Sequence, residues 1–180
     1  VTLVVQDWGG LLGLTLPVDY PDLVSRLLIM NTGFAVGTPP TPGFLAWRDF
    51  VATTPDFDVA QLFRSSEPYL TDSESEAYAA PFPDSSYMAG ARRFPQLVPI
   101  DDSAPGVAIS REAVTWWAQT WDGPTFMAVG VNDPVIGPKV MEIMRSLIRG
   151  CPEPMLVESG HFVPERGDEI ARAALDAWGV

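Results

Sequence analysis

The strongest constraint on the fold is an apolar run that ends abruptly in a glycine-rich turn. Residues 1–5 read Val-Thr-Leu-Val-Val, and Gln-Asp-Trp-Gly-Gly follows at residues 6–10. A largely apolar run of this length is typical of a strand buried on both faces of a parallel sheet. Residues 11–16 predict a buried helix that ends near Pro17, and residues 26–30 predict a second buried strand. A strand, tight turn, helix and strand at this spacing form a βαβ unit, so we expect an α/β protein.

The rest of the chain divides into two further segments after the βαβ unit of residues 1–35. Residues 36–122 begin with a stretch rich in Gly, Pro and Thr and show short helices without a convincing buried strand, which indicates a helical cap. Within this cap Thr71 and Glu74 form a capping-box pattern. Residues 123–180 return to the strand–helix alternation of the core sheet. The elements predicted there are strands at 125–131 and 154–157 and helices at 138–149 and 168–178.

The predicted sheet has only four strands, and its first strand would have an uncovered edge, which is a known aggregation liability. The sequence has no initiating methionine and opens inside the apolar run of residues 1–5. Native domains rarely begin inside a buried strand. We therefore expect N-terminal strands of the sheet to be missing from these 180 residues.

Composition and charge exclude several classes of protein. The chain is 47% hydrophobic and 19% charged, which is the composition of a globular protein. A net charge of −12 with only 11 Lys and Arg residues argues against nucleic-acid binding. No stretch reaches the roughly 20 apolar residues of a membrane span. The single cysteine, Cys151, excludes an internal disulfide framework and fits a reducing compartment, so we expect a cytoplasmic location.

Three ionisable residues follow predicted strands. Asp7 comes after the first strand, Asp133 after the third, and His161 after the fourth. Because the carboxyl ends of parallel strands converge on one crevice, we expect the three side chains to meet there. Their order along the chain, nucleophile, acid and histidine, is that of α/β-hydrolases. Asp7 would occupy the sharp strand-to-helix turn, where Gly9 supplies a small neighbour.

An aspartate at the place of the nucleophile restricts the chemistry. A serine that attacked an alkyl halide would leave an ether, which water does not readily cleave. A carboxylate leaves an ester, whose carbonyl carbon water can attack to release an alcohol and restore Asp7. His161 is the only histidine, so it is the natural base for that water, and Asp133 would orient its ring.

The sequence resembles the haloalkane dehalogenases over essentially its whole length. Four segments carry the resemblance: Gln-Asp-Trp-Gly-Gly at 6–10, Ala-Ala-Pro-Phe-Pro-Asp at 79–84, Gly-Cys-Pro-Glu-Pro at 150–154, and Gly-His-Phe-Val at 160–163. Within the family the chain is similar to the subfamily whose triad acid follows the seventh strand. The resemblance implies the C-terminal half of an α/β-hydrolase parallel sheet with a helical cap insertion.

The resemblance also implies a reaction, in which small haloalkanes are hydrolysed to an alcohol and a halide through an ester on Asp7. Asp7 would be the nucleophile, His161 the base and Asp133 the triad acid. The indole N–H groups of Trp8 and Trp47 would bind the leaving halide, since indole is a donor without an acceptor. The haloalkane and halide would be the only partners, with no cofactor, no metal, and a monomeric protein when complete.

Further assignments concern the pocket and the oxyanion. The resemblance implies that Phe44 and Phe94 are apolar walls of the substrate pocket. The backbone N–H of Trp8 would be one oxyanion donor, while the family's other donor follows an earlier strand that this sequence does not contain. Three more tryptophans have no motif around them, and we expect them to pack within the cap: Trp116, Trp117 and Trp121.

Two alternatives stay open. An epoxide hydrolase also uses an elbow aspartate with a His–Asp pair, and it needs cap tyrosines to protonate the opening oxygen; this cap contains Tyr69, Tyr78 and Tyr87. The matched tryptophans and the Gln before Asp7 favour halide. The other alternative is a non-catalytic fragment or interaction module, unable to turn over without the missing half of the sheet.

Overall fold

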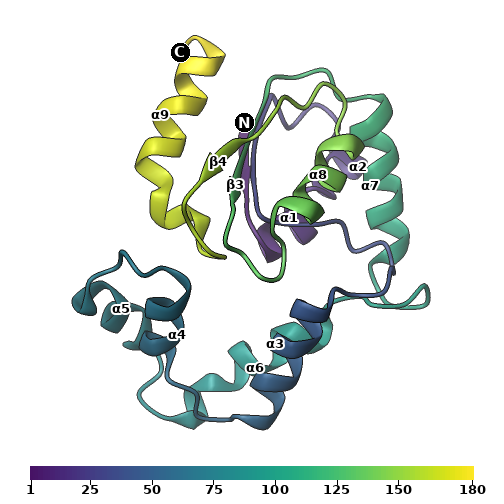
Figure 1. Cartoon of the computed structure of the whole chain (residues 1–180). Coiled ribbons are helices and arrows are strands. Elements are labelled where there is room, and N and C mark those ends of the chain that lie inside the picture. The colour runs from purple at the N-terminus through teal and green to yellow at the C-terminus, as the bar shows by residue number, and fades with distance from the viewer. The chain divides into compact units, whose positions relative to one another are not determined.

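A parallel sheet of four strands forms the centre of one of two structural units. The computed structural model describes residues 1–180. The strands are β1 (Thr2–Val5), β2 (Arg26–Met30), β3 (Thr125–Gly130) and β4 (Met155–Val157), and they lie in the order β1-β2-β3-β4. The register places Val5 beside Ile29, and Ile29 beside Met127. All four strands therefore end at the same edge, as the sequence predicted, and the α/β class is confirmed (Figure 1).

Helices cover both faces of this sheet. The helices of the unit, which comprises residues 1–38 and 99–180, are α1 (Trp8–Gly13), α2 (Leu16–Asp19), α7 (Val107–Gln119), α8 (Pro138–Leu147), η2 (Val163–Arg166) and α9 (Gly167–Trp178). Successive side chains of a strand point to opposite faces of the sheet. Leu27 and Ile29 of β2 therefore pack in a core cluster with residues of α7 and α8 on one face. Leu28 and Met30 pack in a second cluster with residues of α9 on the other face. None of the helices combines the length and the apolar character that a membrane span requires.

The first strand and the segment after it differ from the prediction. Only Val5 of β1 is buried, and Val4 is 56% exposed, because the core cluster on its face of the sheet, which contains Leu28, does not extend to β1. The prediction that this strand is buried on both faces is therefore wrong for this chain. The following apolar run forms two short helices instead of one, and Pro17 lies in the first turn of α2, where proline is well tolerated.

The second unit, residues 39–98, is helical. Its helices are α3 (Pro42–Thr53), α4 (Val59–Ser66), α5 (Asp72–Ala79), η1 (Ser85–Met88) and α6 (Ala89–Leu97), with α3 packed on α6 and α4 on α5. The predicted capping box is present: the Thr71 hydroxyl accepts from the Glu74 N–H, and the Glu74 carboxylate accepts from the Thr71 N–H. This unit has no strand, as expected for a helical cap.

The border between the two units differs from the predicted one at residue 122, because α7 belongs to the sheet unit. Trp117 is fully buried beside sheet residues, and its Nε1 donates to the Leu14 carbonyl at 2.8 Å. The Nε1 of Trp121 donates to the hydroxyl of Thr125 on β3, also at 2.8 Å. The prediction that Trp116, Trp117 and Trp121 pack within the cap is wrong, since all three rings pack in the core under the sheet.

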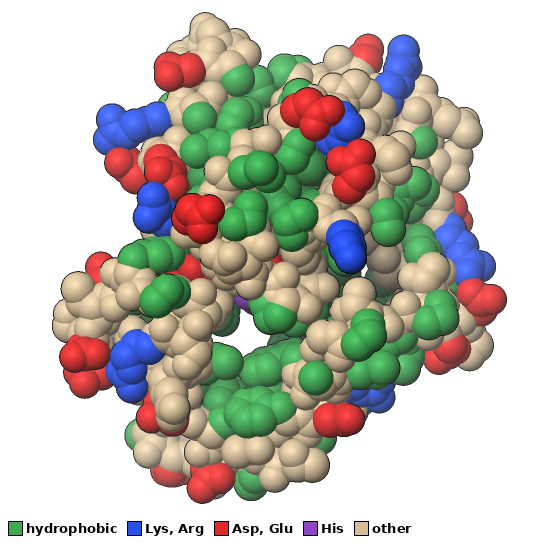
Figure 2. All heavy atoms as spheres, viewed as in Figure 1, with side chains coloured by type: hydrophobic (Ala, Val, Ile, Leu, Met, Phe, Trp, Pro, Cys, Tyr) green, Lys and Arg blue, Asp and Glu red, His purple; other side chains and the backbone are tan.

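Apolar side chains also reach the surface of the sheet unit. Figure 2 shows hydrophobic side chains gathered between α8 and α9, over β4. On β4 itself Leu156 is 65% exposed, and Ile143 on α8 is 61% exposed. β4 has three residues, and short edge strands of this kind limit edge-to-edge pairing.

Candidate active site

Asp7 sits in a strained turn between β1 and α1. Its φ of 47° makes it the one non-glycine residue of the chain with a positive φ. Such a backbone costs on the order of 1–3 kcal/mol and is typical of functional sites. The residue near Asp7 that must be small is Gly10, and not Gly9 as the sequence predicted. A Cβ on Gly10 would lie 2.0 Å from the Thr32 hydroxyl, whereas a Cβ on Gly9 would have no atom within 4 Å.

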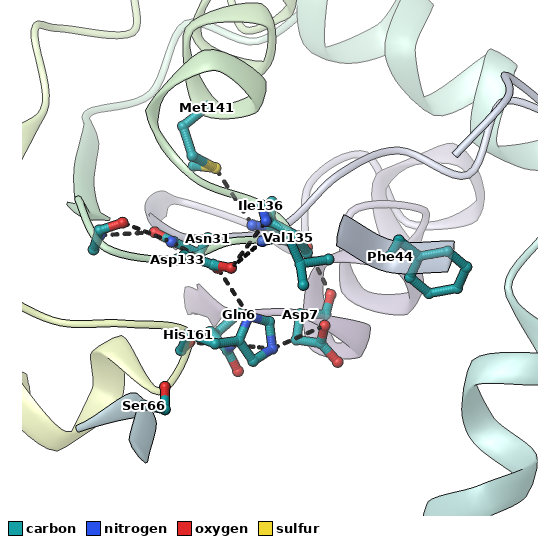
Figure 3. A network of polar contacts seen from close by, with 12 residues as sticks. Gln6, Asp7, Asn31, Phe44, Ser66, Asp133, Val135, Ile136, Met141 and His161 are labelled. Carbon is teal, nitrogen blue, oxygen red and sulfur yellow. Dashed lines mark hydrogen bonds and ion pairs between the residues drawn. The ribbon is translucent and has the colours of Figure 1, made fainter. Parts of the chain in front are cut away.

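The carboxyl ends of three strands bring Asp7, Asp133 and His161 together, as the sequence predicted. The His161 Nε2 lies 3.3 Å from the Asp7 Oδ1, and the His161 Nδ1 lies 2.8 Å from the Asp133 Oδ2. Figure 3 shows the imidazole between the two carboxylates. A neutral ring that donates from Nδ1 to Asp133 would present the Nε2 lone pair on the side of Asp7. The arrangement can therefore orient a base next to a carboxylate nucleophile.

The Asp133 carboxylate is fully buried and hydrogen-bonded on both oxygens. Its Oδ1 accepts from the N–H groups of Val135 at 2.7 Å and Ile136 at 3.0 Å. Its Oδ2 accepts from the His161 ring and from the Asn31 amide, at 2.8 and 2.9 Å. Burial alone would raise the pKa of Asp133, but the hydrogen bond and charge of His161, together with the Asn31 donor, hold this pKa below its ordinary value. Asp133 is thus kept as an anion.

His161 lies between two anions. Burial alone would lower the pKa of its imidazole, but the hydrogen bonds and charges of Asp133 and Asp7 raise this pKa to about 10. The side chain is 24% exposed, so solvent screens these interactions only in part. At neutral pH the site therefore rests as an imidazolium held by two carboxylates.

Asn31 is a residue of the site that the sequence prediction missed. It follows β2 directly and is fully buried. Its Nδ2 donates to the Gly130 carbonyl at 3.1 Å and to the Asp133 Oδ2 at 2.9 Å, and its Oδ1 accepts from the Gly130 N–H at 2.9 Å. Asn31 thereby ties the end of β2 to the end of β3 and to the buried acid. The available signal was its position, a polar residue directly after a buried strand.

Thr32 and Gln6 are the other two residues of the site that were not predicted. The Thr32 hydroxyl donates to the Asp7 carbonyl at 2.6 Å. The Gln6 Nε2 donates to the His161 carbonyl at 3.0 Å and lies 3.4 Å from the His161 Nε2. Gln6, directly after β1, thus fixes the main chain of the loop that carries His161 after β4.

Trp47 lies on α3 in the helical unit and is half-buried there. Its ring stacks on Phe50 and meets the edge of Phe57, with centroid distances of 5.9 Å in both pairs. These contacts fix the indole within its own unit. The predicted halide-binding function of Trp47 stays a prediction.

The other predicted pocket residues are divided between the two units. Trp8 is the first residue of α1, directly after Asp7, and is half-buried. Phe44 is half-buried on α3, and Phe94 is 48% exposed on α6. Their assignment as halide donor and pocket walls stays a prediction. No three His, Cys, Asp or Glu side chains gather in a set that could hold a metal ion.

Comparison with known proteins identifies the family of the chain. The model of the alpha/beta hydrolase fold family matches residues 1–168. A haloalkane dehalogenase from Mycolicibacterium paratuberculosis is 36% identical over 180 residues, and one from Psychrobacter cryohalolentis is 34% identical over 179. A haloalkane dehalogenase from Paraglaciecola agarilytica, solved as a tetramer, superposes with a TM-score of 0.92 at 39% identity.

These similarities cover nearly all of this chain but only part of each relative. The alignments include 97%, 96% and 96% of the chain, and 59%, 58% and 58% of the three relatives in the same order. They confirm the resemblance to haloalkane dehalogenases that the short motifs indicated. The parallel sheet, the elbow at Asp7 and the match over residues 1–168 agree: the chain belongs to the alpha/beta hydrolase fold family.

Proposed function

We propose that the protein hydrolyses carbon–halogen bonds in small haloalkanes and forms an ester on Asp7. The observation that carries this proposal is the Asp7 carboxylate at a strained elbow, 3.3 Å from His161. Aspartate at this position favours displacement at saturated carbon, because the ester that forms can be hydrolysed. The similarity to haloalkane dehalogenases supports the same reaction.

In the first step a carboxylate oxygen of Asp7 attacks the carbon that bears the halogen. The C–O bond forms as the carbon–halogen bond breaks, and the halide leaves with the bonding electron pair. The indole N–H groups of Trp8 and Trp47 stabilise the departing halide as donors. Trp contributes no acceptor, so these groups bind an anion without competing as bases. Phe44 and Phe94 form apolar walls around the substrate chain.

In the second step His161 accepts a proton at Nε2 from a water molecule, whose oxygen adds to the ester carbonyl of Asp7. Asp133 stabilises the imidazolium that forms. The Trp8 backbone N–H is one donor to the oxyanion. As the tetrahedral intermediate collapses, the alcohol oxygen leaves with the proton from His161, and Asp7 is left as a carboxylic acid. This acid passes its proton to the neutral His161 ring, which restores the Asp7 carboxylate beside the imidazolium of the resting site, and the next esterification releases that proton to solvent.

Halide release by the complete natural protein tests this function. The protein is incubated with 1-bromobutane and, separately, with 1,2-epoxybutane, and bromide and diol are both measured. We expect bromide with stoichiometric butanol. Diol without bromide would establish the epoxide hydrolase in its place. Against that alternative, the Tyr69 hydroxyl already donates a hydrogen bond to the Glu67 carboxylate at 2.9 Å, and Tyr87 is 60% exposed.

Three further expectations stay predictions. The non-catalytic alternative is tested by the same bromide assay on residues 1–180 expressed alone. The monomeric state is tested by light scattering on the complete protein, for which the tetrameric relative is the obvious contrast. The cytoplasmic location rests on the low cysteine content and is tested by cell fractionation.

A further inference from the structure

Both peptide groups of Asp7 are held by consecutive residues at the end of β2. The Asp7 N–H donates to the Asn31 carbonyl at 2.9 Å, and the Asp7 carbonyl accepts from the Thr32 hydroxyl at 2.6 Å. Asp7 is also the residue with the strained φ of 47°. A backbone in this region persists only when its surroundings fix it, and a side-chain donor on the carbonyl is one such restraint.

Thr32 is itself immobilised from two sides. Its side chain is fully buried, and its N–H donates to the Met141 Sδ on α8 at 3.3 Å. On the other side it packs against the Cα of Gly10, where a Cβ would lie 2.0 Å from the Thr32 hydroxyl and 2.6 Å from its methyl group. Thr32 therefore fixes both the carbonyl of Asp7 and the start of α1. The Asp7 carbonyl also accepts from the N–H groups of Gly10 and Leu11 in α1, at 3.0 and 3.3 Å, and the Thr32 hydroxyl is the one side-chain donor to the main chain of Asp7.

We propose that Thr32 is a positioning residue for the nucleophile, whose hydroxyl holds the main chain of Asp7 so that the carboxylate faces both the substrate carbon and His161. The proposal rests on the function proposed above. Thr32 touches neither substrate nor reacting atoms and acts through Asp7. Misplacement of a reacting group by about 1 Å can cost on the order of a hundredfold in rate, so a restraint on the main chain of a nucleophile bears directly on the chemistry.

The test compares Thr32→Val, which replaces the hydroxyl by a methyl group of similar size, with Thr32→Ser, which keeps the hydroxyl. Thr125→Val is the matched control, because Thr125 is also buried and its hydroxyl accepts from Trp121, at the amino end of β3. In the complete natural protein, single-turnover mixing with 1-bromobutane and acid quench measures ester on Asp7 by mass spectrometry. We expect ester formation about tenfold slower in Thr32→Val, as for the loss of one hydrogen bond, and near the unmodified rate in Thr32→Ser and Thr125→Val.

A second measurement needs no substrate. The imidazole of His161 is titrated by NMR in each variant, and we expect a lower pKa in Thr32→Val, because a displaced Asp7 carboxylate supports the imidazolium less well. Thr32→Ser should restore the pKa. If Thr32→Val does not fold, Thr32→Ala removes the same hydroxyl without a methyl group beside Gly10.

The outcomes separate the two proposals. Failure of the unmodified protein to form any ester refutes the proposed function. The NMR titration of His161 then tests by itself whether Thr32 positions the Asp7 carboxylate. Thr32 is only structural if Thr32→Val melts at a lower temperature, as Thr125→Val should, but keeps the rate and the His161 pKa of the unmodified protein. A Thr32→Ser variant as impaired as Thr32→Val would also overturn the proposal, because the hydroxyl would then not be the cause.

Discussion

The charge of His161 makes the stability of the protein depend on pH in a predictable direction. The imidazole pKa is about 10 in the folded site and 6.5 as the ordinary value. The folded state therefore binds the proton more tightly than the unfolded state. The stabilisation is complete below pH 6.5, decreases as the pH rises above 6.5, and is lost above pH 10. The difference between the folded and the ordinary pKa of His161, at about 1.36 kcal/mol per pKa unit, corresponds to about 5 kcal/mol of unfolding free energy.

Urea unfolding at a series of pH values from 6 to 10.5 measures this contribution. His161→Gln is the control, because it removes the titrating ring and leaves the other ionisable groups in place. We expect the difference in unfolding free energy between the unmodified protein and His161→Gln to decrease by several kcal/mol over this range. A difference that stays flat between pH 6 and pH 10 would show that Asp7 and Asp133 do not hold the imidazolium, and would refute the electrostatic account of the site.

Three further predictions concern single side chains. His161→Gln should still form the ester on Asp7 but should not hydrolyse it, so mass spectrometry after incubation with 1-bromobutane should find the adduct; normal turnover would contradict the assignment of the base. Gly10→Ala should cost roughly 1–3 kcal/mol in urea unfolding, because its Cβ would overlap the Thr32 side chain, and an unchanged midpoint would exclude that clash. Trp47→Phe keeps the aromatic ring but loses the indole donor, so bromide binding followed by fluorescence should weaken roughly 10–100-fold; equal affinity would remove Trp47 from the halide site.

The sheet was predictable because local chemistry and global topology agree in it. Residues 26–30 were predicted as a strand and form β2 with the same bounds, and the first predicted helix after β3 begins at Pro138 in both. The segment around Trp117 was not assigned correctly. An apolar helix has the same residue pattern whether it covers a cap or a sheet, and only the contacts with Leu14 and the strands distinguish the two.

The site was predictable only in its ionisable members. Asp7, Asp133 and His161 each carry a chemical property that singles them out at the end of a strand. Asn31 and Thr32 stand in an equivalent position after β2, but neutral polar residues at a strand end are also ordinary turn chemistry. Their importance appears in the hydrogen bonds to Gly130, Asp133 and Asp7, which depend on how β2 lies between β1 and β3.

The charges of the site also order the two half-reactions of the proposed function. In the resting site the imidazolium of His161 has no lone pair at Nε2 and cannot act as a base, while the Asp7 anion is available as a nucleophile. Esterification of Asp7 removes one of the two charges that raise the His161 pKa, so the imidazole loses its proton more readily. Asp133 alone then holds the ring by Nδ1, at 2.8 Å, with Nε2 open to water. On the proposed route, formation of the ester therefore generates the base that hydrolyses it, and water is not activated beside a free carboxylate.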